Sequence, residues 1–191
     1  MVRVVAVTKG FGPAAVEAAR AVGLSDIGEN YAAELEKKAP GPVGTRWHFL
    51  GTIQRNKVRE LAPLVAVWES VARLAEGERI ARLAPGATVM VQVDCTGLAV
   101  RNGCTVDETP SLVSSLVALD LTVCGLMTVA PQDPASAADA FRAVAGLADR
   151  LGLPERSMGM SDDLEAAVAA GSTMVRIGRG LFGERGLRVP S

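Results

Sequence analysis

The chain has 191 residues, of which 49% are apolar and 21% are charged, a composition typical of one folded domain rather than a disordered chain. Its 20 Lys and Arg nearly balance its 21 Asp and Glu, giving a formal net charge of -1, so we expect neither nucleic acid nor a membrane as a partner. Cys95, Cys104 and Cys124 form no CxxC pair, which argues against a disulfide framework and indicates a reducing, cytoplasmic location.

Short β-branched apolar runs alternate with longer helical patterns along the whole chain. The expected strands are 2–7, 25–28, 46–50, 65–69, 88–94, 121–129, 156–158 and 174–177. The first expected helix begins at Pro13 and stops at Gly23. The other expected helices are 31–38, 54–61, 71–83, 108–118, 134–151 and 162–170. This succession predicts one domain over residues 1–191, a closed (β/α)8 barrel. An open doubly wound sheet is the alternative, because the strands 25–28 and 156–158 are short.

Lys9 follows the first expected strand, which is apolar at nearly every position, as in a strand buried on both faces of a parallel sheet. In a barrel, the residues that follow the strands carry the function. A lysine that loses hydration there favours its neutral, nucleophilic amine, the form that makes a Schiff base with a carbonyl compound. The alternative is a lysine whose side chain simply extends from the barrel rim to water.

Two loops near the end of the chain have features of a phosphate site. They are SMGMSDD (157–163) and MVRIGRG (174–180), and the loops after strands seven and eight often hold phosphate in this fold. Ser161, before two aspartates, is expected to cap a helix, and Gly178 and Gly180 allow close backbone approach. Ordinary caps and glycine turns are the alternative explanation.

Other polar residues are less informative on their own. Arg176 lies within the eighth expected strand, where a permanent charge needs a carboxylate or a ligand as its partner. His48 is the single histidine, and a hydrogen-bonded core role is the simplest expectation for it. With one histidine and no carboxylate cluster, no metal site is expected. Lys37 and Lys38 are interpreted as favourable charges at a helix end, and Glu29 as a charge at a helix start.

A lysine facing a phosphate-binding rim, with an arginine between them, suits a small phosphorylated carbonyl compound. Pyridoxal 5′-phosphate meets these requirements, and so does a phosphorylated sugar bound by an aldolase. The residues alone do not separate the two.

The longer motifs resemble one protein family over essentially the whole chain. They include AVTK (6–9), IGENYAAE (27–34), RWHFLGTIQRNKVR (46–59) and SMGMSDDLEAAVAAGSTMVRIGRGLFG (157–183). These stretches are similar to the pyridoxal phosphate homeostasis proteins, whose fold resembles the N-terminal barrel of alanine racemase. The resemblance implies a barrel that binds pyridoxal 5′-phosphate as a Schiff base on Lys9.

The resemblance also implies the remaining cofactor-binding residues. In this sequence they are Lys9, Asn30, His48, Met127, Ser157, Met160, Ser161, Arg176, Ile177, Gly178 and Arg179. Arg176 is expected to face the ring nitrogen, where an arginine disfavours protonation of the ring. Ser161 and the backbone of residues 177–179 are expected at the phosphate, with Arg179 at a position that is commonly threonine in the family. The family usually has an additional helix before the first strand, which here is expected to begin at Val2.

The function that the resemblance implies is vitamin B6 homeostasis by a carrier or regulator without established catalysis. It further implies a monomer and cofactor-dependent apo-enzymes as recipients. The alternative is a slow amino-acid racemase or another Schiff-base enzyme. Tyr31 is the single tyrosine, whereas a two-base racemase needs an acid or base on each face of its substrate.

Overall fold

The computed structural model describes residues 1–97 and 102–183. Within them, strands and helices alternate in the expected order. The strands are β1 (Arg3–Val7), β2 (Asp26–Glu29), β3 (Arg46–Phe49), β4 (Val65–Val71), β5 (Thr88–Val93), β6 (Thr122–Thr128), β7 (Glu155–Ser157) and β8 (Met174–Ile177). The helices are α1 (Pro13–Ala21), α2 (Ala32–Lys38), α3 (Val58–Leu61), α4 (Leu74–Leu83), α5 (Thr109–Ala118), α6 (Pro134–Arg150), α7 (Leu164–Ala169) and α8 (Arg179–Phe182).

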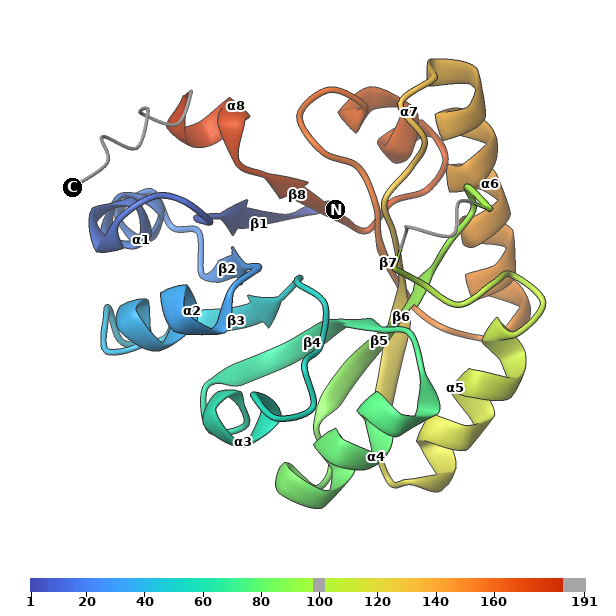
Figure 1. Ribbon diagram of the computed structural model, residues 1–191. Coiled ribbons are helices and arrows are strands. Elements are labelled where there is room, and N and C mark those ends of the chain that lie inside the picture. The colour runs from blue at the N-terminus through green and yellow to red at the C-terminus, as the bar shows by residue number, and fades with distance from the viewer. Residues whose placement is uncertain (98–101, 184–191) are drawn as a thin grey trace.

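The strands form one closed barrel in the order β1 to β8, and each pair of neighbours is parallel. β8 returns to β1, with Val4 opposite Val175 and Ala6 opposite Ile177. Figure 1 shows the helices around the outside of this ring of strands. Closure pairs both edges of the sheet and confirms the predicted (β/α)8 barrel.

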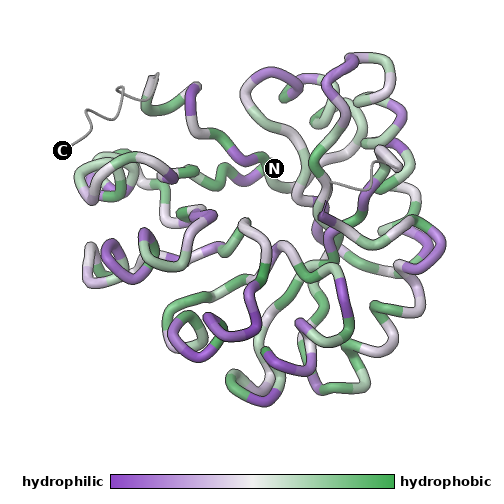
Figure 2. The backbone as a smooth tube through the Cα atoms, viewed as in Figure 1, coloured by the Kyte–Doolittle hydropathy of each residue, from purple (hydrophilic) through white to green (hydrophobic). Residues whose placement is uncertain are grey.

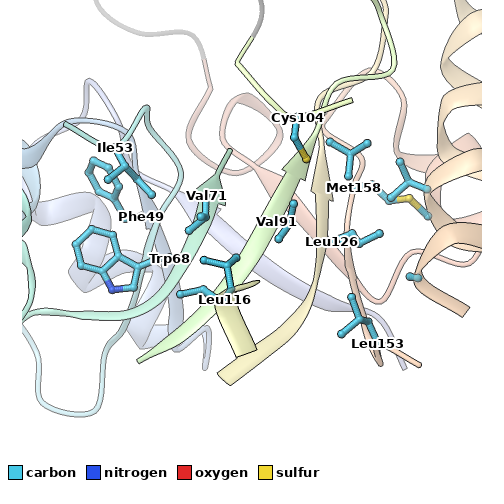
Figure 3. Close-up of a cluster of buried hydrophobic side chains, with 14 of the residues drawn as sticks. Phe49, Ile53, Trp68, Val71, Val91, Cys104, Leu116, Leu126, Leu153 and Met158 are labelled. Atoms are coloured by element: carbon cyan, nitrogen blue, oxygen red, sulfur yellow. The ribbon is translucent and has the colours of Figure 1, made fainter. Parts of the chain in front are cut away.

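Two separate apolar clusters explain why the strands are apolar on both faces. Val5, Val67, Met90, Met127 and Met174 pack together inside the barrel. The larger cluster packs the outer faces of the strands against the helices, and Figure 3 shows part of it. There the Phe49 and Trp68 rings meet edge to face, with centroids 5.8 Å apart. In Figure 2 the strands are mainly hydrophobic, while the helices alternate between hydrophobic and hydrophilic residues.

Several boundaries differ from those that the sequence predicts. The helix expected over 54–61 is helical only over Val58–Leu61, and β4 extends to Val71, so that the next helix begins at Leu74. The short strands expected at 25–28 and 156–158 are both present, each shifted by about one residue. α8 was not predicted. Within the described ranges, no helix is both long and apolar enough to span a membrane.

Candidate functional site

A cavity of about 200 Å³ opens at the end of the barrel where the strands terminate. Its walls come from residues in the last positions of β1, β6 and β8 and from the loops that follow β1, β2, β3, β6, β7 and β8. They are Val7, Lys9, Asn30, Leu50, Met127, Val129, Met160, Ser161, Asp162, Arg176, Gly178 and Arg179. This is the end of a (β/α)8 barrel that carries functional sites.

The structure brings most of the predicted site residues together in this cavity. Eight line it, namely Lys9, Asn30, Met127, Met160, Ser161, Arg176, Gly178 and Arg179. The other three predicted residues, His48, Ser157 and Ile177, are not among the described residues that line the cavity. His48 and Ser157 are fully buried and connect to the cavity through Glu69 and Arg176. Ile177 is buried and packs on the other side of β8, near Val2 and Val175.

Arg176 lines the cavity and is buried, with only 5% of the residue exposed. Its guanidinium donates to the Ser157 carbonyl at 2.6 Å, to the Ser157 hydroxyl at 2.9 Å and to the Thr128 carbonyl at 2.6 Å. The Ser157 hydroxyl in turn donates to Glu69 Oε2 at 2.5 Å. Burial lowers the pKa of Arg176, and the negative charge of Glu69 opposes that shift. These contacts hold a cation in one orientation at the cavity.

His48 extends this network toward the opposite end of the barrel. Its Nδ1 lies 2.5 Å from Glu69 Oε1, and its Nε2 lies 2.9 Å from Asp26 Oδ1. Burial by itself lowers the pKa of His48, but the hydrogen bonds to Asp26 and Glu69 outweigh burial and raise it. An imidazolium donates from both nitrogens, so two carboxylate neighbours favour it. The expectation of a hydrogen-bonded core histidine therefore agrees with the structure.

The two phosphate-type loops meet at the mouth of the cavity. The Gly180 amide donates to the Ser161 hydroxyl at 3.2 Å, and Arg179 forms an ion pair with Asp162. The prediction that Ser161 caps a helix is wrong, because α7 begins at Leu164 and Asp163 is its N-cap. The hydroxyl of Ser161 instead bridges the two loops.

An aromatic contact joins the turn after β1 to the loop after β8. The rings of Phe11 and Phe182 lie with their centroids 5.3 Å apart. Phe11 follows the turn that carries Lys9, and Phe182 ends α8. The contact therefore places the amine-bearing turn beside the loop that includes Gly178 and Arg179.

Glu29 and Lys38 form a buried ion pair that the sequence did not reveal. Their side chains are 0% and 2% exposed, and Lys38 Nζ lies 2.6 Å from Glu29 Oε1. The interpretation of Glu29 as a charge at a helix start is wrong, since Glu29 ends β2. Lys38 does lie in the last turn of α2, but its side chain turns into the protein. Burial raises the pKa of Glu29, while Lys38 and Thr8 oppose that shift.

The described cysteines and acidic residues show neither an activated thiol nor a metal-binding cluster. Burial raises the pKa of all three thiols, that of Cys124 to about 12, so a thiolate is disfavoured at neutral pH. In the parts of the chain that the structure describes, no group of three or more His, Cys, Asp and Glu could hold a metal ion.

The cavity also contains residues that the sequence did not single out as binding residues. They are Val7, Leu50, Val129 and Asp162. Only their position at or after the end of a strand could have indicated from the sequence that they line the cavity. Asn30, which lines the cavity, has a buried Oδ1 atom without a hydrogen-bond partner among the described residues. A buried polar atom of this kind normally has a hydrogen-bond partner.

Comparison with known proteins gives the family. The alanine racemase N-terminal domain family matches residues 1–186. The pyridoxal phosphate homeostasis protein of Pseudomonas aeruginosa is 40% identical, over all of this chain and 87% of its own length. The protein of the same name from Deinococcus radiodurans is also 40% identical, over 95% of this chain and 88% of its own length.

Solved structures show the same architecture. PipY of Synechococcus elongatus PCC7942, solved with PLP bound, is 31% identical and superposes with a TM-score of 0.83, covering 95% of this chain and 92% of PipY. Alanine racemase from Corynebacterium glutamicum has a TM-score of 0.74 at 18% identity, covering all of this chain and 58% of the racemase. The latter likeness concerns the fold alone.

The fold and the position of the cavity define a (β/α)8 barrel of the alanine racemase N-terminal type. The similarity along nearly the full length of the curated relatives is more specific. The chain belongs to the pyridoxal phosphate homeostasis protein family.

Proposed function

We propose that this protein binds pyridoxal 5′-phosphate in the cavity at the mouth of the barrel and holds it as a Schiff base on Lys9. The observation that carries the proposal is the placement of Lys9, Arg176 and the Ser161–Arg179 loops around one cavity. The bound cofactor supplies an electrophilic aldehyde. The nitrogen of the Lys9 amine adds to that aldehyde carbon and water leaves, so the step needs no oxidant or reductant.

The other cavity residues fit the remaining groups of this cofactor. Arg176 cannot accept a proton, so beside a pyridine nitrogen it favours the unprotonated ring and weakens the cofactor as an electron sink. Ser161, Gly178 and Arg179 would hold the phosphate, with Arg179 exchanging its contact with Asp162 for one with the ligand. The open Asn30 Oδ1 atom would accept from a hydroxyl of the ligand.

These features favour a carrier or regulator of the cofactor. An arginine at the ring nitrogen weakens the electron sink on which carbanion chemistry by this cofactor depends, and reversible capture of an aldehyde suffices for storage and release. The names of the curated relatives agree with this role. The exposed mouth of the cavity is the surface through which cofactor-dependent apo-enzymes would receive their cofactor.

A titration with two ligands tests the proposal. Pyridoxine 5′-phosphate has an alcohol where pyridoxal 5′-phosphate has its aldehyde, so it has the ring and phosphate contacts without the covalent bond. We expect the wild-type protein to bind the aldehyde more tightly than the alcohol, and Lys9→Ala to bind both alike. Lys57→Ala removes an exposed lysine that pairs with Glu60 and should behave as wild type. An aldehyde preference that survives in Lys9→Ala would refute the role of Lys9.

A further inference from the structure

The turn that carries Lys9 is attached to α2 on both sides of that residue. Before Lys9, the Thr8 carbonyl accepts a hydrogen bond from Lys38 Nζ at 2.8 Å. After it, the Gly10 amide donates to Glu34 Oε2 at 2.7 Å. Glu34 and Lys38 lie one turn apart on α2, which contacts β2 and lies next to α1 (Figure 1).

One ammonium group connects these attachments. Lys38 Nζ lies 2.6 Å from Glu29 Oε1, 3.0 Å from Glu34 Oε2 and 2.8 Å from the Thr8 carbonyl. An ammonium has three protons, so these contacts use all of them. The Thr8 hydroxyl donates to the same Glu29 oxygen at 2.6 Å. Both peptide groups next to Lys9 are therefore held by a single cluster, in which Lys38 and Glu29 are buried and Glu34 is partly exposed.

Apolar side chains could also pack α2 against the barrel. Burying charges carries a desolvation penalty, and well-packed apolar residues often replace a buried ion pair without loss of stability. Apolar residues, however, cannot fix a carbonyl and an amide at set positions. What the cluster provides beyond packing is a defined backbone conformation at residues 8–10, where Gly10 has a φ of 77°.

We infer that Lys38 and Glu34 are positioning residues for Lys9. They fix the turn so that the Lys9 side chain enters the cavity, where the amine can reach the aldehyde carbon. Neither residue lines the cavity, so both act through the backbone of the turn. The inference rests on the proposed function, because it assigns a purpose to the placement of that amine.

Glu34→Ala is the main test variant, because the Glu34 side chain is 22% exposed and the Lys38–Glu29 pair remains in place. Without any ligand, we expect faster hydrogen exchange at the Gly10 amide. With ligands, we expect an affinity for pyridoxal 5′-phosphate about tenfold weaker, as for the loss of one hydrogen bond to a charged group. The affinity for pyridoxine 5′-phosphate should stay unchanged.

Lys38→Met removes the central cation and should produce larger changes of the same kind. Lys37→Met is the matched control, because Lys37 is the exposed neighbour on the same helix, and it should match wild type. Since Lys38→Met leaves Glu29 buried without its partner and can fail to fold, the paired variant Lys38→Met/Glu29→Gln removes both charges. It should fold and still show the selective loss of affinity for the aldehyde.

Two results would overturn the inference. One is an unchanged exchange rate at Gly10 in Glu34→Ala, and the other is an equal loss of affinity for the aldehyde and the alcohol. Failure of the proposed function would look different: the wild-type protein itself would bind both compounds equally. The exchange measurement needs no ligand, so it would still decide whether Glu34 and Lys38 fix the turn.

Discussion

The Arg176 guanidinium is a charge buried inside the barrel, beside the apolar cluster of Val5, Val67, Met90, Met127 and Met174. Its charge is balanced through Ser157 by Glu69, which is fully buried and also contacts His48. Removing one member of a buried charged network leaves the remaining charges buried without a partner. The resulting loss of stability exceeds the net stability that the intact network contributes. Arg176 is thus a structural residue as well as a wall of the cavity.

For this reason Arg176→Ala should lower the free energy of unfolding by about 3–5 kcal/mol, as for one partner lost from a buried ion pair. Chemical denaturation would measure the change. Arg142→Ala, which breaks an exposed pair with Asp139, is the control and should change stability little. A loss of less than about 1 kcal/mol in Arg176→Ala would contradict the buried network.

His48 gives the network a dependence on pH. Because its pKa is raised above 6.5 in the folded state, the folded protein keeps a proton that the unfolded chain releases. The free energy of unfolding should therefore decrease as the pH rises from about 6.5 through the folded-state pKa. Asp26 and Glu69 have lowered pKa values, so their contributions are lost only under acid conditions, outside this range.

Denaturation of wild type and His48→Gln between about pH 6 and 8 would test this linkage. The wild-type protein should lose stability across the range, while the variant should show a nearly flat profile. His48 is the single histidine, and the cysteine thiols titrate at higher pH. Parallel profiles for the two proteins would show that His48 does not keep its proton.

Among the elements, the loops that follow the strands determine the geometry of the cavity. Gly51, after β3, lies against Asn30, after β2. A Cβ at position 51 would overlap the Asn30 carbonyl oxygen and lie 2.7 Å from the carbonyl carbon. Because both colliding atoms belong to the backbone, the two loops could accommodate a side chain only by moving apart, and Asn30 would move with them.

Gly51→Ala should consequently destabilise the protein by about 1–3 kcal/mol, the usual range for overpacking, and weaken binding of pyridoxine 5′-phosphate. Gly12→Ala is a suitable control, since Gly12 has a φ of -76° and no atom within 4 Å of an added Cβ. Denaturation and ligand titration of the two variants would measure both effects. Equal stability of Gly51→Ala and Gly12→Ala would show that the loops have room to separate.

Sequence patterns predict these elements well where burial determines the residue types. β1 and β5 are apolar on both faces because one face meets the barrel interior and the other meets the helices, and both were predicted to within two residues. α3 was predicted too long, because residues 55–57 have a helical pattern but form turns. α8 was missed since a four-residue helix has too few positions to show a period.

The candidate site was predictable to the extent that it depends on position along a strand. Lys9, Asn30 and Gly178 follow strand ends, and a barrel brings all such ends to one mouth. The Lys38–Glu29 pair was not predictable in this way. Lys37 and Lys38 are adjacent on one helix, and only the packing of α2 decides which of the two is buried.

At the scale of the whole molecule, closure of the barrel brings residues from the first and last strands to the same cavity. The pairing of β8 with β1 places Arg176 beside Val5, so the last strand and the first contribute to one cavity. Lys9 and Arg176 are 167 residues apart in the sequence, and no local pattern connects them. The proposal that Lys9, one of four lysines in the chain, captures the cofactor beside the loops proposed to hold its phosphate depends on this closure.

Borohydride reduction after incubation with pyridoxal 5′-phosphate tests that claim most directly, because reduction makes a Schiff base permanent and peptide mass spectrometry locates it. With cofactor at about one equivalent, we predict a single adduct, on Lys9, and its loss on competition with excess pyridoxine 5′-phosphate. An adduct found on Lys37, Lys38 or Lys57 instead of Lys9 would contradict the account.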